Sequence, residues 1–211
     1  MNMLSGFTKL TTVFIVALVT ATSAFAAGDP AAGERQAAAC AACHGQDGAT
    51  PLAPDYPKLA GQNEKYAFAQ LKMIQDNTRN IALMAGQLNG KSEQDLADLA
   101  AYYASLPAKG AQASGTDEAL AIGEKIYKGG IADKGVAACA ACHSPNGNGN
   151  TQAGFPRING QPAAYTIAQL TAYREKVRAT DEAWGGMMRG VAEGLTDTEM
   201  ALVADYIQGL N

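Results

Sequence analysis

The sequence contains few side chains that bind metals or carry redox chemistry, and it has no surplus of basic residues. Its 211 residues include only four cysteines and two histidines. The formal net charge is -4, so the chain lacks the basic stripe that is typical of nucleic-acid binders, and we expect no nucleic-acid partner. Aromatic residues make up 7% of the chain and glycine occurs 23 times, which leaves little apolar mass for a large core. The hydrophobic share of 47% nevertheless argues against a wholly disordered chain.

Long hydrophobic runs are also missing, apart from a short one near the start of the chain. The run from Val13 to Val19 follows a single basic residue, Lys9, and leads to small residues at Ala24 and Ala26. Those small residues fit the A-x-A pattern of a signal-peptidase site. The run is too short for a comfortable transmembrane helix, so residues 1–26 are predicted to be a secretory signal peptide cleaved after Ala26. An uncleaved membrane anchor is the alternative, and otherwise we expect an exported, soluble mature protein.

All of the cysteines and histidines fall into two copies of one pentapeptide. Residues 40–44 and 139–143 both read C-A-A-C-H. C-x-x-C-H is the attachment signature of c-type haem, in which two thiols bond to the porphyrin and the adjacent histidine binds the iron. We therefore expect two covalent haem c groups, with these attachment and proximal-ligand residues: Cys40, Cys43, His44, Cys139, Cys142 and His143.

Three other uses of paired cysteines fit the sequence less well. A thioredoxin-like C-x-x-C needs a β-α-β setting, whereas the flanks here are rich in alanine. A zinc site leaves the adjacent histidines unexplained, and the two pairs are nearly a hundred residues apart. A disulfide closed across two intervening residues would stabilise the fold little.

The duplication extends well beyond the pentapeptides. Residues 56–62 match residues 155–161 at the same shift of 99, whereas near the end of each half the shift is 104. The change implies five inserted residues between Leu170 and Met188. The chain is therefore predicted to be a tandem duplication of one small domain, with domains at residues 27–112 and 113–211.

Each half is predicted to consist of helices joined by long loops. Asp29 and Thr116 are good first-helix caps, and the helix that follows Asp29 is expected to run into the first C-A-A-C-H. The last helix of each half begins with a capping box, Ser92-x-x-Asp95 or Thr196-x-x-Glu199. No segment alternates as a strand does, so the fold class is all-α. A small helical domain has little core of its own, and a buried haem would supply it.

The sixth ligand of each iron has few candidates. No third histidine exists, so a methionine thioether, which is a soft and uncharged donor, is the natural choice. Met84 lies eight residues before the Ser92 cap, and Met188 lies eight residues before the Thr196 cap. We assign Met84 and Met188 and expect both in loops, with Met187 as the competitor in the second half.

Each proximal histidine needs a group that orients its ring. Metal-bound histidine nearly always donates its second N–H to a carbonyl or carboxylate. Pro57 and Pro156 each lie thirteen residues after the histidine of their half, and each has a carbonyl that is free to accept. An ordinary loop proline is the alternative at both positions.

The two C-A-A-C-H sites, the Y/F-P-K/R-L/I-x-G-Q segments and the M-R-G-V-A to L-T-D-T-E stretch together resemble the dihaem cytochrome c4 family. The resemblance covers residues 27–211. It implies two class I cytochrome c domains related by a pseudo-twofold axis, with histidine and methionine on each iron. It assigns the ligands to Met84 and Met188 and the carbonyl acceptors to Pro57 and Pro156. Family members are periplasmic carriers, soluble or loosely associated with a membrane. The departure from the family is a short first methionine loop at residues 78–83.

The predicted function is therefore outer-sphere electron transfer in a respiratory chain. With both axial positions occupied, no iron site is open to a substrate, so we expect an electron carrier without substrate chemistry of its own. The expected partners are a redox donor and an acceptor, such as a cytochrome complex or a terminal oxidase, and the carrier is expected to be a monomer. A dihaem peroxidase-type enzyme and a cytochrome subunit of a larger oxidoreductase are the alternatives.

Overall fold

The computed structural model describes residues 27–210. The predicted signal peptide, residues 1–26, and Asn211 lie outside the described residues. Within residues 27–210 no strand forms, and the only β-type pairings are two isolated bridges, Ile131 with Val136 and Asn150 with Phe155. The expectation of an all-α fold is thereby confirmed. No helix in this part of the chain is both long enough and apolar enough to cross a membrane.

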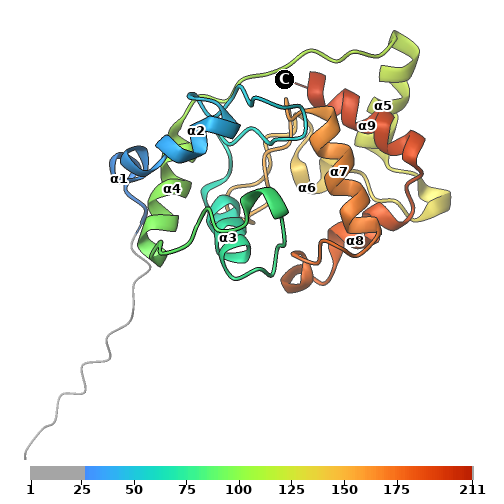
Figure 1. The fold of residues 1–211 in the computed structure, drawn as a ribbon. Coiled ribbons are helices and arrows are strands. Elements are labelled where there is room, and N and C mark those ends of the chain that lie inside the picture. The colour runs from blue at the N-terminus through green and yellow to red at the C-terminus, as the bar shows by residue number, and fades with distance from the viewer. Residues whose placement is uncertain (1–26, 211) are drawn as a thin grey trace, which may run out of the picture.

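The described elements are short helices separated by long connections (Figure 1). In chain order they are α1 (Pro30–Gln36), α2 (Ala38–His44), α3 (Glu64–Gln75), η1 (Ala82–Met84), α4 (Glu93–Ser105), α5 (Asp117–Gly129), η2 (Ala132–Lys134), α6 (Ala140–His143), α7 (Ala163–Arg174), η3 (Glu182–Trp184), α8 (Met187–Glu193) and α9 (Asp197–Gly209).

The helices form two bodies that lie side by side. Figure 1 shows α1 to α4 in one body and α5 to α9 in the other, with the extended chain between α4 and α5 running along one edge. The first body has a small buried core of Ala37, Leu99 and Tyr103. The core of the second body is larger and includes the fully buried Tyr127 and Met200. Two tandem domains of the predicted kind are therefore present.

Capping boxes start the last helix of each body, as predicted. The Ser92 hydroxyl accepts from the Asp95 N–H at 3.2 Å, and the Asp95 carboxylate accepts from the Ser92 N–H at 2.8 Å. Thr196 and Glu199 make the same reciprocal pair at 3.3 and 2.8 Å. The paired bonds satisfy N–H groups that a helix start otherwise leaves without partners.

Glycine allows the first helix of each body to cross the last helix closely. A Cβ atom built on Gly33 of α1 would lie 2.1 Å from the Asp98 carbonyl oxygen of α4. A Cβ built on Gly123 of α5 would lie 2.4 Å from the Leu202 carbonyl oxygen of α9. Asp98 and Leu202 are 104 residues apart, so the two crossings are equivalent in the repeat.

The first predicted helix is interrupted. The sequence predicts one helix from Pro30 through the first C-A-A-C-H, but α1 and α2 separate at Ala37. The Ala37 N–H bonds the Glu34 carbonyl at 3.1 Å, and the Cys40 N–H bonds the Ala37 carbonyl at 2.9 Å. Two such i to i+3 bonds tighten the backbone and end the regular α-helical ladder at this point.

The second predicted methionine loop is also partly helical. Met188 is the second residue of α8 rather than a loop residue. Gly185 and Gly186 turn the chain in left-handed conformations just before it, with φ of 66° and 73°. The Arg189 guanidinium binds the Asp181 carboxylate at 2.8 Å and ties the new helix to the preceding turn.

Candidate functional site

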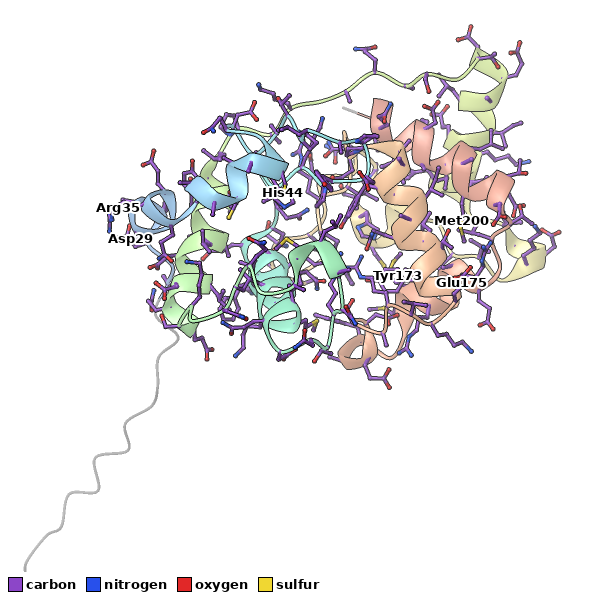
Figure 2. The ribbon with its side chains drawn as sticks, viewed as in Figure 1. Asp29, Arg35, His44, Tyr173, Glu175 and Met200 are labelled. Atoms are coloured by element: carbon purple, nitrogen blue, oxygen red, sulfur yellow. The ribbon has the colours of Figure 1, made fainter. Side chains whose placement is uncertain are left out.

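The two C-A-A-C-H segments end in equivalent places. The segment of the first body finishes α2 at His44, and that of the second body finishes α6 at His143. Figure 2 shows His44 at the end of α2 that faces the middle of the molecule. All four cysteines are free thiols, none joined in a disulfide. Burial raises the pKa of the Cys139 thiol to about 11, so this sulfur is protonated at neutral pH.

Both histidines are buried and oriented by a proline carbonyl. Nδ1 of His44 lies 2.9 Å from the Pro57 oxygen, and Nδ1 of His143 lies 2.9 Å from the Pro156 oxygen. A carbonyl oxygen can only accept, so Nδ1 carries the proton and Nε2 has the lone pair that can bind a metal. Burial lowers the pKa of both rings, which favours the neutral form that a ligand needs.

An aromatic ring accompanies each histidine. Tyr56 lies 6.3 Å from the His44 ring, centroid to centroid, with the planes tilted by 51°. Phe155 lies 6.4 Å from the His143 ring at a tilt of 56°. These near-identical geometries show that the repeat preserves the surroundings of the histidines as well as the histidines themselves.

The methionines differ in their surroundings. Met84 ends the 3-10 helix η1 and is half-buried, and Met188 packs against the core of the second body. Met187 is 41% exposed and Met200 is fully buried in the core. The structure therefore gives Met188, rather than Met187, the inward position.

A pair of buried arginines lies between the two bodies. The Arg79 guanidinium donates to Gln70 in its own half and to Gln169 in the other, both at 3.0 Å. The Arg178 guanidinium donates to Gln169 at 2.7 Å and to Gln70 at 3.0 Å. Among residues 27–210 no carboxylate lies within 4.0 Å of either guanidinium, so two buried positive charges have only neutral partners.

The positive pair also influences a partly buried tyrosine, Tyr66. Arg178 donates to the Tyr66 hydroxyl at 2.9 Å, and Arg79 donates to the Tyr165 hydroxyl at 3.3 Å. Burial alone would raise the pKa of Tyr66, but the charges of Arg178 and Arg79 outweigh it and lower that pKa. Arginine is nearly always ionised in proteins, so the field at this interface is strongly positive.

Sequence reasoning did not select this interface, although a signal for it exists. Arg79 and Arg178 are 99 residues apart, as are the glutamines that they bind. Asn77 and Lys176, also 99 apart, share a left-handed backbone with φ of 63° and 60°. The repeat therefore continues as far as Arg178, and the five inserted residues fall between Arg178 and Met188.

The residues present fit a covalently held haem in each body. Each body offers two free thiols, a buried neutral histidine with a free Nε2, and a methionine thioether. The two uncompensated guanidinium groups match the negative charge of haem propionates.

Comparisons with known proteins agree with this geometry. The model of the Cytochrome c family matches twice, at residues 30–107 and 120–211. Cytochrome c4 of Pseudomonas aeruginosa is 45% identical over 188 residues, covering 89% of this chain and 92% of that protein. The thiosulfate dehydrogenase electron acceptor of Thiomonas intermedia is 38% identical over 84% of this chain and 81% of its own length.

A solved structure shares the whole arrangement. The crystal structure of reduced recombinant cytochrome c4 from Pseudomonas stutzeri superposes with a TM-score of 0.83 at 43% identity, covering 88% of this chain and all of that one. Members of this family bind covalently attached haem c, and the matches cover both halves of the chain. The chain therefore binds two covalently attached haem c groups. The chain belongs to the cytochrome c4 family of dihaem electron carriers.

Proposed function

We propose that each body holds its haem through the residues that the repeat places in equivalent positions. Cysteine thiols form the thioether bonds, a histidine supplies the proximal ligand, and a methionine supplies the distal ligand. The proposed sets are Cys40, Cys43, His44 and Met84 in residues 27–112, and Cys139, Cys142, His143 and Met188 in residues 113–211. The matched histidine–proline bonds carry this proposal, because a haem ligand needs its second nitrogen occupied.

The protein's own groups would hold and shield the redox centres. When bound, each haem supplies a one-electron ferric–ferrous couple. The Pro57 and Pro156 carbonyls accept from Nδ1 of His44 and His143, so Nε2 of each buried ring would be free to bind the iron. A methionine at the sixth position would leave no site for a substrate, so electrons would enter and leave without bond formation.

The arginine pair would complement the anionic edges of the two haems. Arg79 and Arg178 are buried among neutral amides and tyrosines, and burying a charge without a counter-charge is costly. Propionate groups would supply the missing negative charge. The same positive field would favour the electron-rich ferrous state at both centres.

The proposed role is a periplasmic carrier in a respiratory chain. Export of residues 27–211 after cleavage at Ala26 would place the cysteines where c-type haem is attached, and the carrier would deliver electrons to a terminal oxidase or a similar acceptor. The Thiomonas relative is named for accepting electrons from a thiosulfate dehydrogenase, so a dehydrogenase of that class is the donor to test first.

The distal ligands can be tested by spectroscopy. In the ferric protein we expect a methionine-to-iron charge-transfer band from both haems. Met188→Ala should abolish the band of the second haem, and Met84→Ala that of the first. Met187→Ala is the matched control, because its side chain is 41% exposed and should leave the band intact. Loss of the band in Met187→Ala alone would reverse the assignment.

The carrier role has a separate test. Purified ferrous protein mixed with membranes that contain a terminal oxidase should be reoxidised faster than by oxygen alone. Turnover of peroxide by a high-spin haem in the untreated protein would favour a peroxidase-type enzyme instead. Stoichiometric copurification with a catalytic partner would favour a subunit of a larger oxidoreductase.

A further inference from the structure

Two glutamines join the bodies through matched pairs of hydrogen bonds. Oε1 of Gln161 accepts from the Lys58 N–H at 3.0 Å, and Nε2 of Gln161 donates to the Lys58 carbonyl at 2.8 Å. Gln62 makes the same pair with Arg157, at 2.8 and 2.9 Å. Each body therefore has one short stretch of backbone held by a side-chain amide of the other body.

The stretch of backbone that is held is the one that orients the histidine. The Pro57 carbonyl and the Lys58 N–H belong to one peptide group. The carbonyl accepts from Nδ1 of His44 at 2.9 Å, while the N–H donates to Gln161 at 3.0 Å. A continuous chain of hydrogen bonds thus runs from an imidazole in one body, through one peptide, to an amide in the other.

The second body has the same chain with the roles reversed. Nδ1 of His143 donates to the Pro156 carbonyl at 2.9 Å, and the Arg157 N–H of the same peptide group donates to Gln62 at 2.8 Å. Oε1 of Gln62 also accepts from the Asn63 N–H at 2.8 Å, so its capacity is divided between two donors.

We infer that Gln62 and Gln161 are positioning residues that tune the proximal histidine of the opposite body, and thereby the redox potential of the opposite haem. Donation from a peptide N–H draws charge onto the carbonyl oxygen of the same group, because the peptide is conjugated. A more negative carbonyl accepts a stronger hydrogen bond from Nδ1–H. The stronger bond makes the imidazole a better electron donor to iron through Nε2. A better donor stabilises the ferric state and lowers the potential. This inference rests on the ligand roles proposed above for His44 and His143.

The inference predicts a crossed pattern of effects. Gln161→Met keeps the length of the side chain but removes the acceptor oxygen. The reduction potential of the first haem should therefore rise, while that of the second haem should stay unchanged. Gln62→Met should raise the reduction potential of the second haem alone. The change should be smaller, because Oε1 of Gln62 accepts from the Asn63 N–H as well as from the Arg157 N–H. For Gln161→Met we expect about a threefold change in the ferric–ferrous equilibrium constant, which is about 28 mV for one electron.

Two further variants sharpen the test. Gln161→Glu keeps an acceptor and adds negative charge, so the first haem should fall in potential rather than rise. Gln208→Met is the matched control. The Gln208 amide accepts from the Ala163 N–H at 2.8 Å and donates to the Gln112 carbonyl at 2.7 Å, and neither peptide group accepts a hydrogen bond from His44 or His143. It should move neither potential.

The experiment is a potentiometric titration of the loaded full-length protein, with each haem identified by NMR of its axial methionine. In the ferrous protein, NMR also reports the His44 Nδ1 proton directly, and Gln161→Met should move that resonance upfield. Equal changes at both haems, or a change in the mutated residue's own body, would overturn the inference, since an opened interface has that effect. Absence of the methionine–iron band or of covalent haem in the unmutated protein would instead refute the proposed ligands.

Discussion

The close crossing of α1 on α4 gives the sharpest prediction about stability. In Gly33→Ala the new Cβ would lie 2.1 Å from the Asp98 carbonyl oxygen and 2.6 Å from its carbonyl carbon. Ordinary contact begins near 3.4 Å, so the helices must separate by about 1 Å. Both obstructing atoms are backbone, and no side-chain rotation can relieve the overlap.

The expected cost follows from two opposing effects. Overpacking of a well-packed contact costs about 1–3 kcal/mol, and an unyielding backbone places this case near the upper value. Alanine favours a helix over glycine by about 1 kcal/mol. The net loss in the free energy of unfolding should therefore be about 2 kcal/mol. Gly123→Ala, at 2.4 Å from the Leu202 carbonyl oxygen, should behave in the same way in the second body.

Guanidinium unfolding of the haem-loaded protein, followed by far-UV circular dichroism, measures the effect. Gly190→Ala is the control, because this α8 glycine has nothing within 4 Å of a built Cβ. It should raise the unfolding midpoint through helix propensity alone, whereas Gly33→Ala should lower it. A Gly33→Ala protein as stable as Gly190→Ala would show that the crossing tolerates a methyl group, contrary to this prediction.

Three further predictions concern polar contacts. Tyr127→Phe should lower the free energy of unfolding by about 0.5–1.5 kcal/mol, measured by denaturant titration, because the Ser144 carbonyl loses its 2.6 Å bond but keeps the bond from the Gly147 N–H at 3.1 Å. Arg178→Gln should raise the pKa of Tyr66, measured by ultraviolet titration of tyrosinate, and an unchanged pKa would contradict the field described here. The Lys134 ammonium, together with the Thr196 N–H and hydroxyl, lowers the Glu199 pKa from 4.5 to about 2, so the stabilisation is present above pH 4.5 and is lost as pH falls toward 2. In Glu199→Gln the free energy of unfolding should therefore fall less steeply with pH between 4.5 and 2. The same pH dependence as in the unmutated protein would contradict this prediction.

Local signals in the sequence were sufficient for much of this fold. The capping boxes at Ser92 and Thr196 appear as predicted, because a cap depends on residues three positions apart. The all-α class follows from the absence of alternating segments. The break at Ala37 was missed, since two i to i+3 turns in an alanine-rich stretch leave no compositional trace.

The contacts between the two bodies could not be predicted from the sequence. Arg79 and Arg178 each contact residues about ninety or more positions away, and only the three-dimensional pairing of the bodies brings them together. The 99-residue repeat marks both arginines as equivalent, and it marks Gln62 and Gln161 in the same way. Equivalence alone, however, does not show that these side chains cross to the opposite body.

The intact mass of the protein from the periplasm shows whether both haem groups are attached. We expect a polypeptide of residues 27–211 that carries two covalently attached haem groups, one on Cys40 and Cys43 and the other on Cys139 and Cys142. A mass that corresponds to the bare polypeptide, with four thiols still open to alkylation, would contradict it.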